Sequence, residues 1–244
     1  MINKIQKRIY FSLFKNFNNH FNQKYLLIHF PKTAGTLLKI EIENKKLFNQ
    51  IIYFDHEQNF SRLYKRYPKH KFIIFIRNPL TWYISYYHNK FKSLKKHKLY
   101  DKNHFLDYIN DLVINQSVSS IRRWHVPNKK NTIMDMVAEL NNNELGFFTK
   151  VFFMYTLKDP ITNLNKLKNT TDKETVKNMI GVDNIYKYEN LEKFNQSVFK
   201  NTKRMIDFNR YENKGPKINF KDYYDKKIIN KIMEKDKIIF DLFY

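Results

Sequence analysis

Short continuous runs of apolar residues alternate along the chain with stretches that have the periodicity of helices. The apolar runs lie at residues 25–30, 50–54, 71–76 and, more weakly, 184–188. Continuous runs of this kind are typical of strands that are covered on both faces, as in a parallel sheet. Three other stretches predict helices: Thr36–Lys46, Glu57–Tyr67 and Pro79–Leu94. The alternation predicts an α/β fold, a doubly wound parallel sheet flanked by helices.

The second half of the chain has a different pattern. From about residue 100 to residue 180 it predicts several helices and few strands, which we interpret as a helical lobe inserted in a single domain, residues 1–244. Phe147–Leu157 fits a helix or a strand by periodicity, and we favour a helix. Asp222–Tyr244 predicts one long amphipathic helix that closes the domain.

The composition limits the kinds of partner and site. The formal net charge of +22 favours polyanionic partners, although an A/T-rich coding sequence, which also enriches Lys, Asn, Ile, Phe and Tyr, explains it equally well. The chain has no cysteine, which excludes disulfides and thiolate metal sites. No apolar stretch approaches the roughly 20 residues of a membrane span. We therefore expect a cytoplasmic protein, or a protein of the secretory-pathway lumen if an anchor was removed.

The N-terminal segment, residues 1–21, mixes apolar residues with lysines. It is too interrupted for the apolar region of a signal peptide. It predicts an amphipathic helix that either packs on the domain or rests on an anionic membrane surface.

Rare residue types gather at two places. The chain has four glycines and two alanines, and Ala34 and Gly35 are adjacent. Arginine is scarce beside lysine, with eight residues, so an arginine such as Arg77 points to a need for the planar guanidinium fork.

A candidate phosphate loop follows the first apolar run and leads into a helix. Its residues are Pro31, Lys32, Thr33, Ala34, Gly35, Thr36 and Leu37. Open α/β sheets bind ligands outside the carboxyl ends of their strands, and a helix N-terminus offers backbone N–H groups to phosphate. The lysine precedes the glycine, unlike the order in the ATPase-type loop, and the first glycine of that loop is missing.

A second candidate anion site follows the third run. Arg77 stands at the end of this run and Asn78-Pro79 starts the next helix, on which Ser85 lies two turns along. Arg77 offers bidentate donors and Ser85 a hydroxyl, so both residues can serve one anion.

These two motifs resemble those of sulfotransferases that use 3'-phosphoadenosine-5'-phosphosulfate (PAPS). Residues 29–36 are similar to the H-x-P-K-T-A/G-G-T form of the carbohydrate-acting members, and residues 77–87 to R-D/N-P-x-x-x-x-x-S-x-Y. The resemblance implies a P-loop-like fold in which residues 31–37 bind the 5'-phosphosulfate, and Arg77 and Ser85 bind the 3'-phosphate. It also implies that PAPS becomes 3'-phosphoadenosine-5'-phosphate (PAP) after the transfer. Trp82 departs from the basic residue often found there.

The resemblance also implies the remaining roles. Lys32 would stabilise the leaving phosphate. A histidine after the second strand would be the general base, which indicates His56. Asp55 would orient the ring of His56, and Glu57 is the alternative base. Tyr188-Glu189-Asn190-Leu191 resembles a late Y/F-E-D/N-L segment of these enzymes. In the lobe, on the acceptor side, four residues are candidates for binding an acidic sugar or for a solvated face: Arg122, Arg123, Trp124 and His125.

The expected activity is transfer of a sulfuryl group to a hydroxyl of a glycan or cell-envelope polysaccharide. No metal is required, since Lys32 and Arg77 can neutralise the nucleotide. A nucleotide-dependent kinase with an atypical loop, a relative without activity, and a protein that binds polyanions by charge alone remain alternatives. Charge alone explains neither motif, and we expect no nucleic-acid partner.

Overall fold

The structure is a computed structural model. It describes residues 25–45, 47, 50–54, 58–91, 102–124, 133–140, 144–167, 170, 172–199, 205–206 and 220–244. The predicted N-terminal helix and its membrane contact lie outside these residues.

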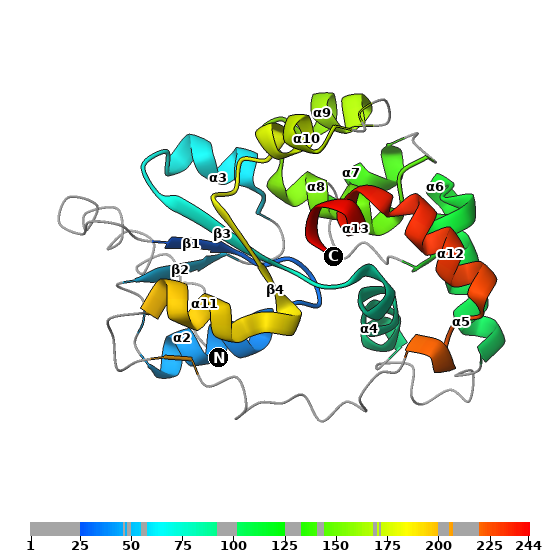
Figure 1. Ribbon diagram of the computed structural model, residues 1–244, viewed down its shortest axis with the longest axis horizontal. Helices are drawn as coiled ribbons and strands as arrows, with labels where there is room; N and C mark the ends of the chain where they lie inside the picture. Colours follow the sequence, from blue (N-terminus) through cyan, green and yellow to red (C-terminus); the bar gives the residue numbers. More distant parts are fainter. Residues whose placement is uncertain are drawn as a thin grey trace.

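Four parallel strands form the sheet, in the order β2-β1-β3-β4 (Figure 1). They are β1 (Tyr25–Ile28), β2 (Ile51–Phe54), β3 (Lys71–Ile76) and β4 (Asn184–Lys187). The sequence prediction of these strands is confirmed. Ile28 at the end of β1 pairs with Phe54 on one side and Ile74 on the other. The β1 strand is therefore central, with both neighbours parallel to it.

Helices cover both faces of the sheet. On one face, α2 (Gly35–Asn44) and α11 (Leu191–Phe199) pack on the sheet through a small apolar cluster. On the other face, α3 (Phe60–Arg66) and α8 (Phe147–Thr156) belong to the main core. The expected α/β architecture with a flanked parallel sheet is confirmed.

The burial of helix α8 explains why the periodicity of its sequence fits both a helix and a strand. All ten of its residues are buried. A helix that is covered on every side carries no polar stripe, so the period of 3.6 is hidden in its sequence. The helical interpretation is confirmed.

The prediction of several helices between about residues 100 and 180 is confirmed in the described part of this stretch, to which α4 (Pro79–Phe91) leads from the sheet (Figure 1). Its elements are α5 (Lys102–Ile109), a π-helical segment (Asn110–Asn115), α6 (Val118–Trp124), α7 (Ile133–Glu139), α8, α9 (Pro160–Leu167) and α10 (Lys173–Met179).

The prediction of one long C-terminal helix is wrong. After a short 3₁₀ turn (Phe220–Asp222), the chain forms α12 (Lys226–Lys235) and α13 (Lys237–Phe243), which are separated at Asp236. The carbonyl of Lys235 accepts a hydrogen bond from the N–H of Gly146 at 2.7 Å. The helix breaks because its backbone and Asp236 are committed to α8, a tertiary contact that sequence periodicity does not reveal.

Asp236 is fully buried, and its carboxylate caps the first turn of α8, a helix that lies far from it along the chain. Its Oδ1 accepts hydrogen bonds from the Thr149 N–H at 2.9 Å and the Thr149 hydroxyl at 2.6 Å. Its Oδ2 accepts a bond from the Tyr83 hydroxyl at 3.0 Å. The preceding N-cap residue, Gly146, has no side chain, and a Cβ there would lie 2.1 Å from Asp236 Oδ1. The network therefore joins α4, α8 and the C-terminal helices.

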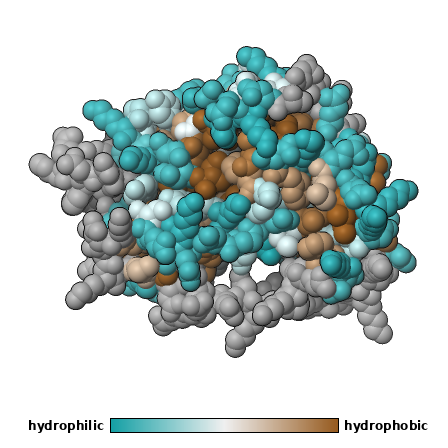
Figure 2. Space-filling model, in the orientation of Figure 1, coloured by the Kyte–Doolittle hydropathy of each residue, from teal (hydrophilic) through white to brown (hydrophobic). Residues whose placement is uncertain are grey.

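Figure 2 shows hydrophilic side chains over most of one face of the molecule and an apolar band across its middle. In the part of the chain that the structure describes, no helix is both long enough and apolar enough to cross a membrane.

Candidate functional site

The two predicted anion motifs lie side by side at the carboxyl edge of the sheet. The chain leaves β1 toward β2 and leaves β3 toward β4, which lie on opposite sides of this pair. In open α/β sheets such a reversal marks the place outside the strand ends where ligands bind. We call this place, between the loop after β1 and Arg77 after β3, the crevice. Arg77 Nη1 donates a hydrogen bond across it to the Lys32 carbonyl at 3.4 Å.

The loop after β1 is held in an unusual backbone conformation. Lys32 and Ala34 have φ angles of 66° and 60°, in the left-handed region that residues with a Cβ rarely adopt. Helix α2 begins at Gly35, and the N-cap Ala34 has no side chain that bonds to it. The first intrahelical bond is donated by Leu38 to Ala34 at 2.9 Å, so the N–H groups of residues 35–37 face the crevice end of the helix. This end is suited to phosphate.

The two threonines of the loop have different roles. The Thr33 hydroxyl donates to the Phe30 carbonyl at 2.7 Å and is buried, so it stabilises the turn instead of offering a donor to a ligand. The side chain of Thr36 is exposed. Of the two threonine hydroxyls, that of Thr36 is the candidate donor to a ligand.

Gly35 is required by a neighbour that the sequence does not indicate. A Cβ at Gly35 would lie 1.7 Å from Nε2 of His29, far inside van der Waals contact. The small size of this residue therefore leaves room for the imidazole of His29, which packs against it.

Arg77 is half-buried and its orientation is set by several neighbours. Its Nε donates to the Thr81 hydroxyl at 3.1 Å, and its guanidinium lies 4.7 Å from the ring centroid of Tyr188. Burial lowers the pKa of Arg77, and Tyr188 and Glu189 oppose that shift. Within the described residues Nη2 makes no hydrogen bond, so one corner of the fork is available for an anion.

The late segment at residues 188–191 supports the Arg77 motif directly. Ile76 pairs with Lys187 in the register of β3 and β4, which places Tyr188 beside Arg77. Glu189 Oε1 accepts a hydrogen bond from the Asn78 N–H at 2.8 Å. The turn that carries Arg77 is therefore supported by the strand that follows it in the sheet.

Trp82 connects α4 to the loop. Its indole N–H donates to the Pro31 carbonyl at 2.7 Å, and the side chain is fully buried. We treated this residue as a minor departure from the sulfotransferase pattern. Its structural role was missed, and the pairing of a buried indole with a carbonyl 51 residues away has no signal in the sequence.

Ser85 lies half-buried on α4 and makes no hydrogen bond among the described residues. The side chain on α4 that contacts Arg77 is Thr81. Ser85 therefore stays a candidate for the anion but does not belong to the network that orients Arg77.

Comparisons with family models, with curated proteins and with solved structures found no match. The chemistry therefore has to be inferred from the crevice itself, which combines a helix N-terminus, Lys32 and Arg77. These groups suit a ligand with two separated anionic groups.

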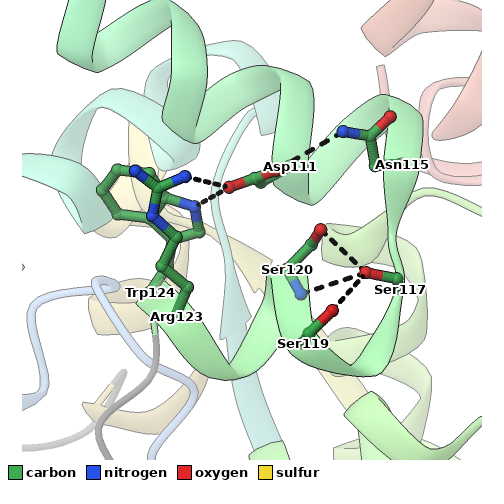
Figure 3. A network of polar contacts seen from close by, with 7 residues as sticks. All are labelled: Asp111, Asn115, Ser117, Ser119, Ser120, Arg123 and Trp124. Carbon is green, nitrogen blue, oxygen red and sulfur yellow. Dashed lines mark hydrogen bonds and ion pairs between the residues drawn. The ribbon is translucent and has the colours of Figure 1, made fainter.

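Two of the acceptor candidates in the helical lobe, Arg123 and Trp124, share the carboxylate of Asp111 as their partner (Figure 3). Trp124 is 5% exposed, and its indole N–H donates to Asp111 Oδ2 at 2.6 Å. Arg123 pairs with Asp111 at 3.4 Å, and Arg122 with Glu139 at 3.2 Å. The Trp124 ring packs edge-on against His104 and Tyr108, which leaves little of it exposed for contact with a ligand.

The remaining candidate residues lie outside the part of the chain that the structure describes. His56, with its neighbours Asp55 and Glu57, and His125 fall on residues that the structure does not describe. In the described part of the chain, no group of three or more His, Asp or Glu side chains is arranged to hold a metal ion.

Proposed function

We propose that this protein is a sulfotransferase that transfers the sulfuryl group of PAPS to a hydroxyl of a glycan or cell-envelope polysaccharide. The observation that carries the proposal is the contact between Arg77 Nη1 and the Lys32 carbonyl, which joins the two motifs at one crevice. PAPS has two anionic ends, a 5'-phosphosulfate and a 3'-phosphate, and the crevice has two separate places for anions.

The 5'-phosphosulfate would lie at the N-terminus of α2, where the N–H groups of residues 35–37, the Thr36 hydroxyl and Lys32 offer donors and positive charge. The 3'-phosphate would lie on Arg77 and Ser85. The structure supports this assignment through the free corner of Arg77 and through the position of Ser85 two turns along α4.

In the proposed reaction the acceptor oxygen attacks sulfur, and the bond from sulfur to the bridging oxygen of the phosphate breaks. The acceptor proton passes to a base, for which His56 is our proposal on the resemblance alone. The electron pair of the broken bond stays on the phosphate of PAP, where Lys32 neutralises the new charge. The sulfuryl group is thus transferred without any change in the oxidation state of sulfur.

The test is a thermal-shift series with PAP, ATP plus Mg²⁺, AMP and adenosine 5'-phosphosulfate. A ligand that binds only the folded state raises the unfolding temperature, and the rise grows with the logarithm of the ratio of its concentration to its dissociation constant. We expect the largest shift with PAP. A shift with ATP and Mg²⁺ but none with PAP would favour a kinase, and equal salt-sensitive shifts with every anion would favour a protein that binds polyanions by charge.

Trp82→Phe should weaken both the fold and the donor site. It removes the bond to the Pro31 carbonyl and leaves a small cavity, so we expect the free energy of unfolding to fall by about 2–3 kcal/mol. We also expect a several-fold loss of PAP affinity, because Pro31 is the first residue of the loop. Denaturant unfolding and calorimetric titration measure the two effects.

Trp124→Phe is the matched control for Trp82→Phe, since the chain has two tryptophans and Trp124 also donates its indole N–H, to Asp111. It should lower stability comparably and leave PAP affinity unchanged. If both variants lost PAP affinity equally, the loss would reflect destabilisation and not the loop.

A further inference from the structure

His29 is a polar side chain held directly beneath the phosphate loop. It follows the last residue of β1, and its N–H continues the ladder by donating to the Phe54 carbonyl at 3.1 Å. The residue is 7% exposed. Its ring edge, at Nε2, lies against Gly35, the first residue of α2. The ring thus links the end of the sheet to the start of the helix.

Tyr53 determines how that ring is oriented. The Tyr53 hydroxyl and Nδ1 of His29 are hydrogen-bonded, and the two ring centroids are 5.4 Å apart. Tyr53 lies on β2, where it pairs with Leu27 of β1, so its side chain comes from a rigid strand. With Nδ1 held, the opposite edge of the imidazole points to Gly35.

The loop needs such support because two of its residues are strained. Left-handed conformations at Lys32 and Ala34 cost about 1–2 kcal/mol each, and they persist only where neighbours hold them. Bonds from Trp82, Arg77 and Thr33 hold the loop at Pro31, Lys32 and the Phe30 carbonyl. At the other end of the loop, the side chain of His29 packs against Gly35.

We propose that His29 is a positioning residue for the 5'-phosphosulfate: its imidazole, oriented by Tyr53, sets where the first N–H groups of α2 stand relative to Lys32. This inference rests on the proposed function and goes beyond it by assigning His29 and Tyr53 a part in binding one end of the donor. Neither residue needs to touch the nucleotide or take part in the transfer.

A pair of ligands separates positioning from general destabilisation. PAP uses both anion sites, whereas adenosine 3'-phosphate lacks the group that the loop would hold. We expect His29→Ala to lower the affinity for PAP about tenfold and to leave that for adenosine 3'-phosphate unchanged. Tyr53→Phe should lower PAP affinity about threefold, and should add nothing in the His29→Ala background, because Tyr53 acts through the imidazole.

A size exchange tests the contact itself. Gly35→Ala should lower PAP affinity about a hundredfold, since the new methyl group meets the ring. His29→Ala removes the obstacle, so the double variant His29→Ala/Gly35→Ala should bind PAP about as well as His29→Ala alone. The full chain is used throughout, with calorimetric titration for affinity and thermal unfolding to show that each variant is folded.

The outcomes distinguish this inference from the proposed function. If the wild-type protein does not bind PAP, the proposed function fails and this inference fails with it. If the wild type binds PAP and His29→Ala binds it equally well, only the positioning role is overturned. Equal losses for PAP and adenosine 3'-phosphate, or a double variant as weak as Gly35→Ala, would likewise overturn it.

Discussion

Arg77→Ala is expected to lower the affinity for PAP by roughly 100-fold and to leave the affinity for AMP nearly unchanged. A charge-assisted, bidentate bond to phosphate contributes about 1.5–3 kcal/mol, and a factor of ten in affinity corresponds to about 1.4 kcal/mol. Calorimetric titration of both nucleotides with the variant and the wild type measures the effect.

Two variants separate the roles of Arg77. Arg77→Lys keeps the charge but lacks the fork and its stacking on Tyr188, so we expect most of the loss to remain. Thr81→Val removes the partner of Nε together with the bond from the Thr81 hydroxyl to the Asn78 carbonyl, and should lower PAP affinity about threefold. If Arg77→Ala lost PAP and AMP affinity alike, the side chain would serve the loop and not the 3'-phosphate.

Asp236→Ala is expected to cause the largest loss of stability, about 3–5 kcal/mol in the free energy of unfolding. The substitution leaves two donors of Thr149 and the Tyr83 hydroxyl without their acceptor. It also leaves the buried Lys150, whose pKa burial lowers to about 8, without the carboxylate that opposes that shift. Breaking a buried charge network by removing one member typically costs this much. Urea unfolding measures it.

Asp236→Asn is the control, because it keeps an oxygen acceptor without the charge. The difference in stability between this variant and the wild type should depend on pH. Burial raises the pKa of Asp236 from 3.8 to about 6. The folded state therefore binds more protons than the unfolded state between pH 4 and 6, so the stability from this group falls as the pH rises through that window. The fall is at most about 3 kcal/mol.

Asp236→Asn should lack this slope, so that its stability relative to the wild type improves from pH 4 to pH 7. Unfolding curves at pH 4, 5, 6 and 7 for both proteins provide the comparison. Parallel pH profiles would show that Asp236 is already ionised at pH 4 in the folded protein, contrary to the expectation.

Much of the fold was determined by the sequence. The strands β1 and β3 follow from continuous apolar runs, because a strand buried on both faces must be apolar along nearly its whole length, and β4 at the edge of the sheet follows from a weaker run. The helical second half follows from periodicity, and the place of the anion site follows from motifs at the ends of β1 and β3. These are local properties, carried by residues that are close together in the chain.

The supports of that site were decided by the tertiary structure. Gly35 accommodates His29, Trp82 bonds to the Pro31 carbonyl, and Glu189 supports the turn at Asn78. Two of these contacts join residues more than 50 positions apart, and the third depends on which ring occupies the space beside the loop. Residue type alone does not specify a partner at that range.

The same limit explains the wrong prediction of one C-terminal helix and the unforeseen burial of Trp124. The C-terminal segment has the periodicity of one helix, but Asp236 divides it because its carboxylate caps α8 across the core. Trp124 resembles a stacking platform among cations, but Asp111 binds its N–H and the lobe covers its ring. The sequence thus determined which segments are strands and helices and where the two candidate anion motifs lie, because burial and helix ends leave local patterns. Only the tertiary structure decided which polar side chains are satisfied by one another, because those partners come from distant parts of the chain.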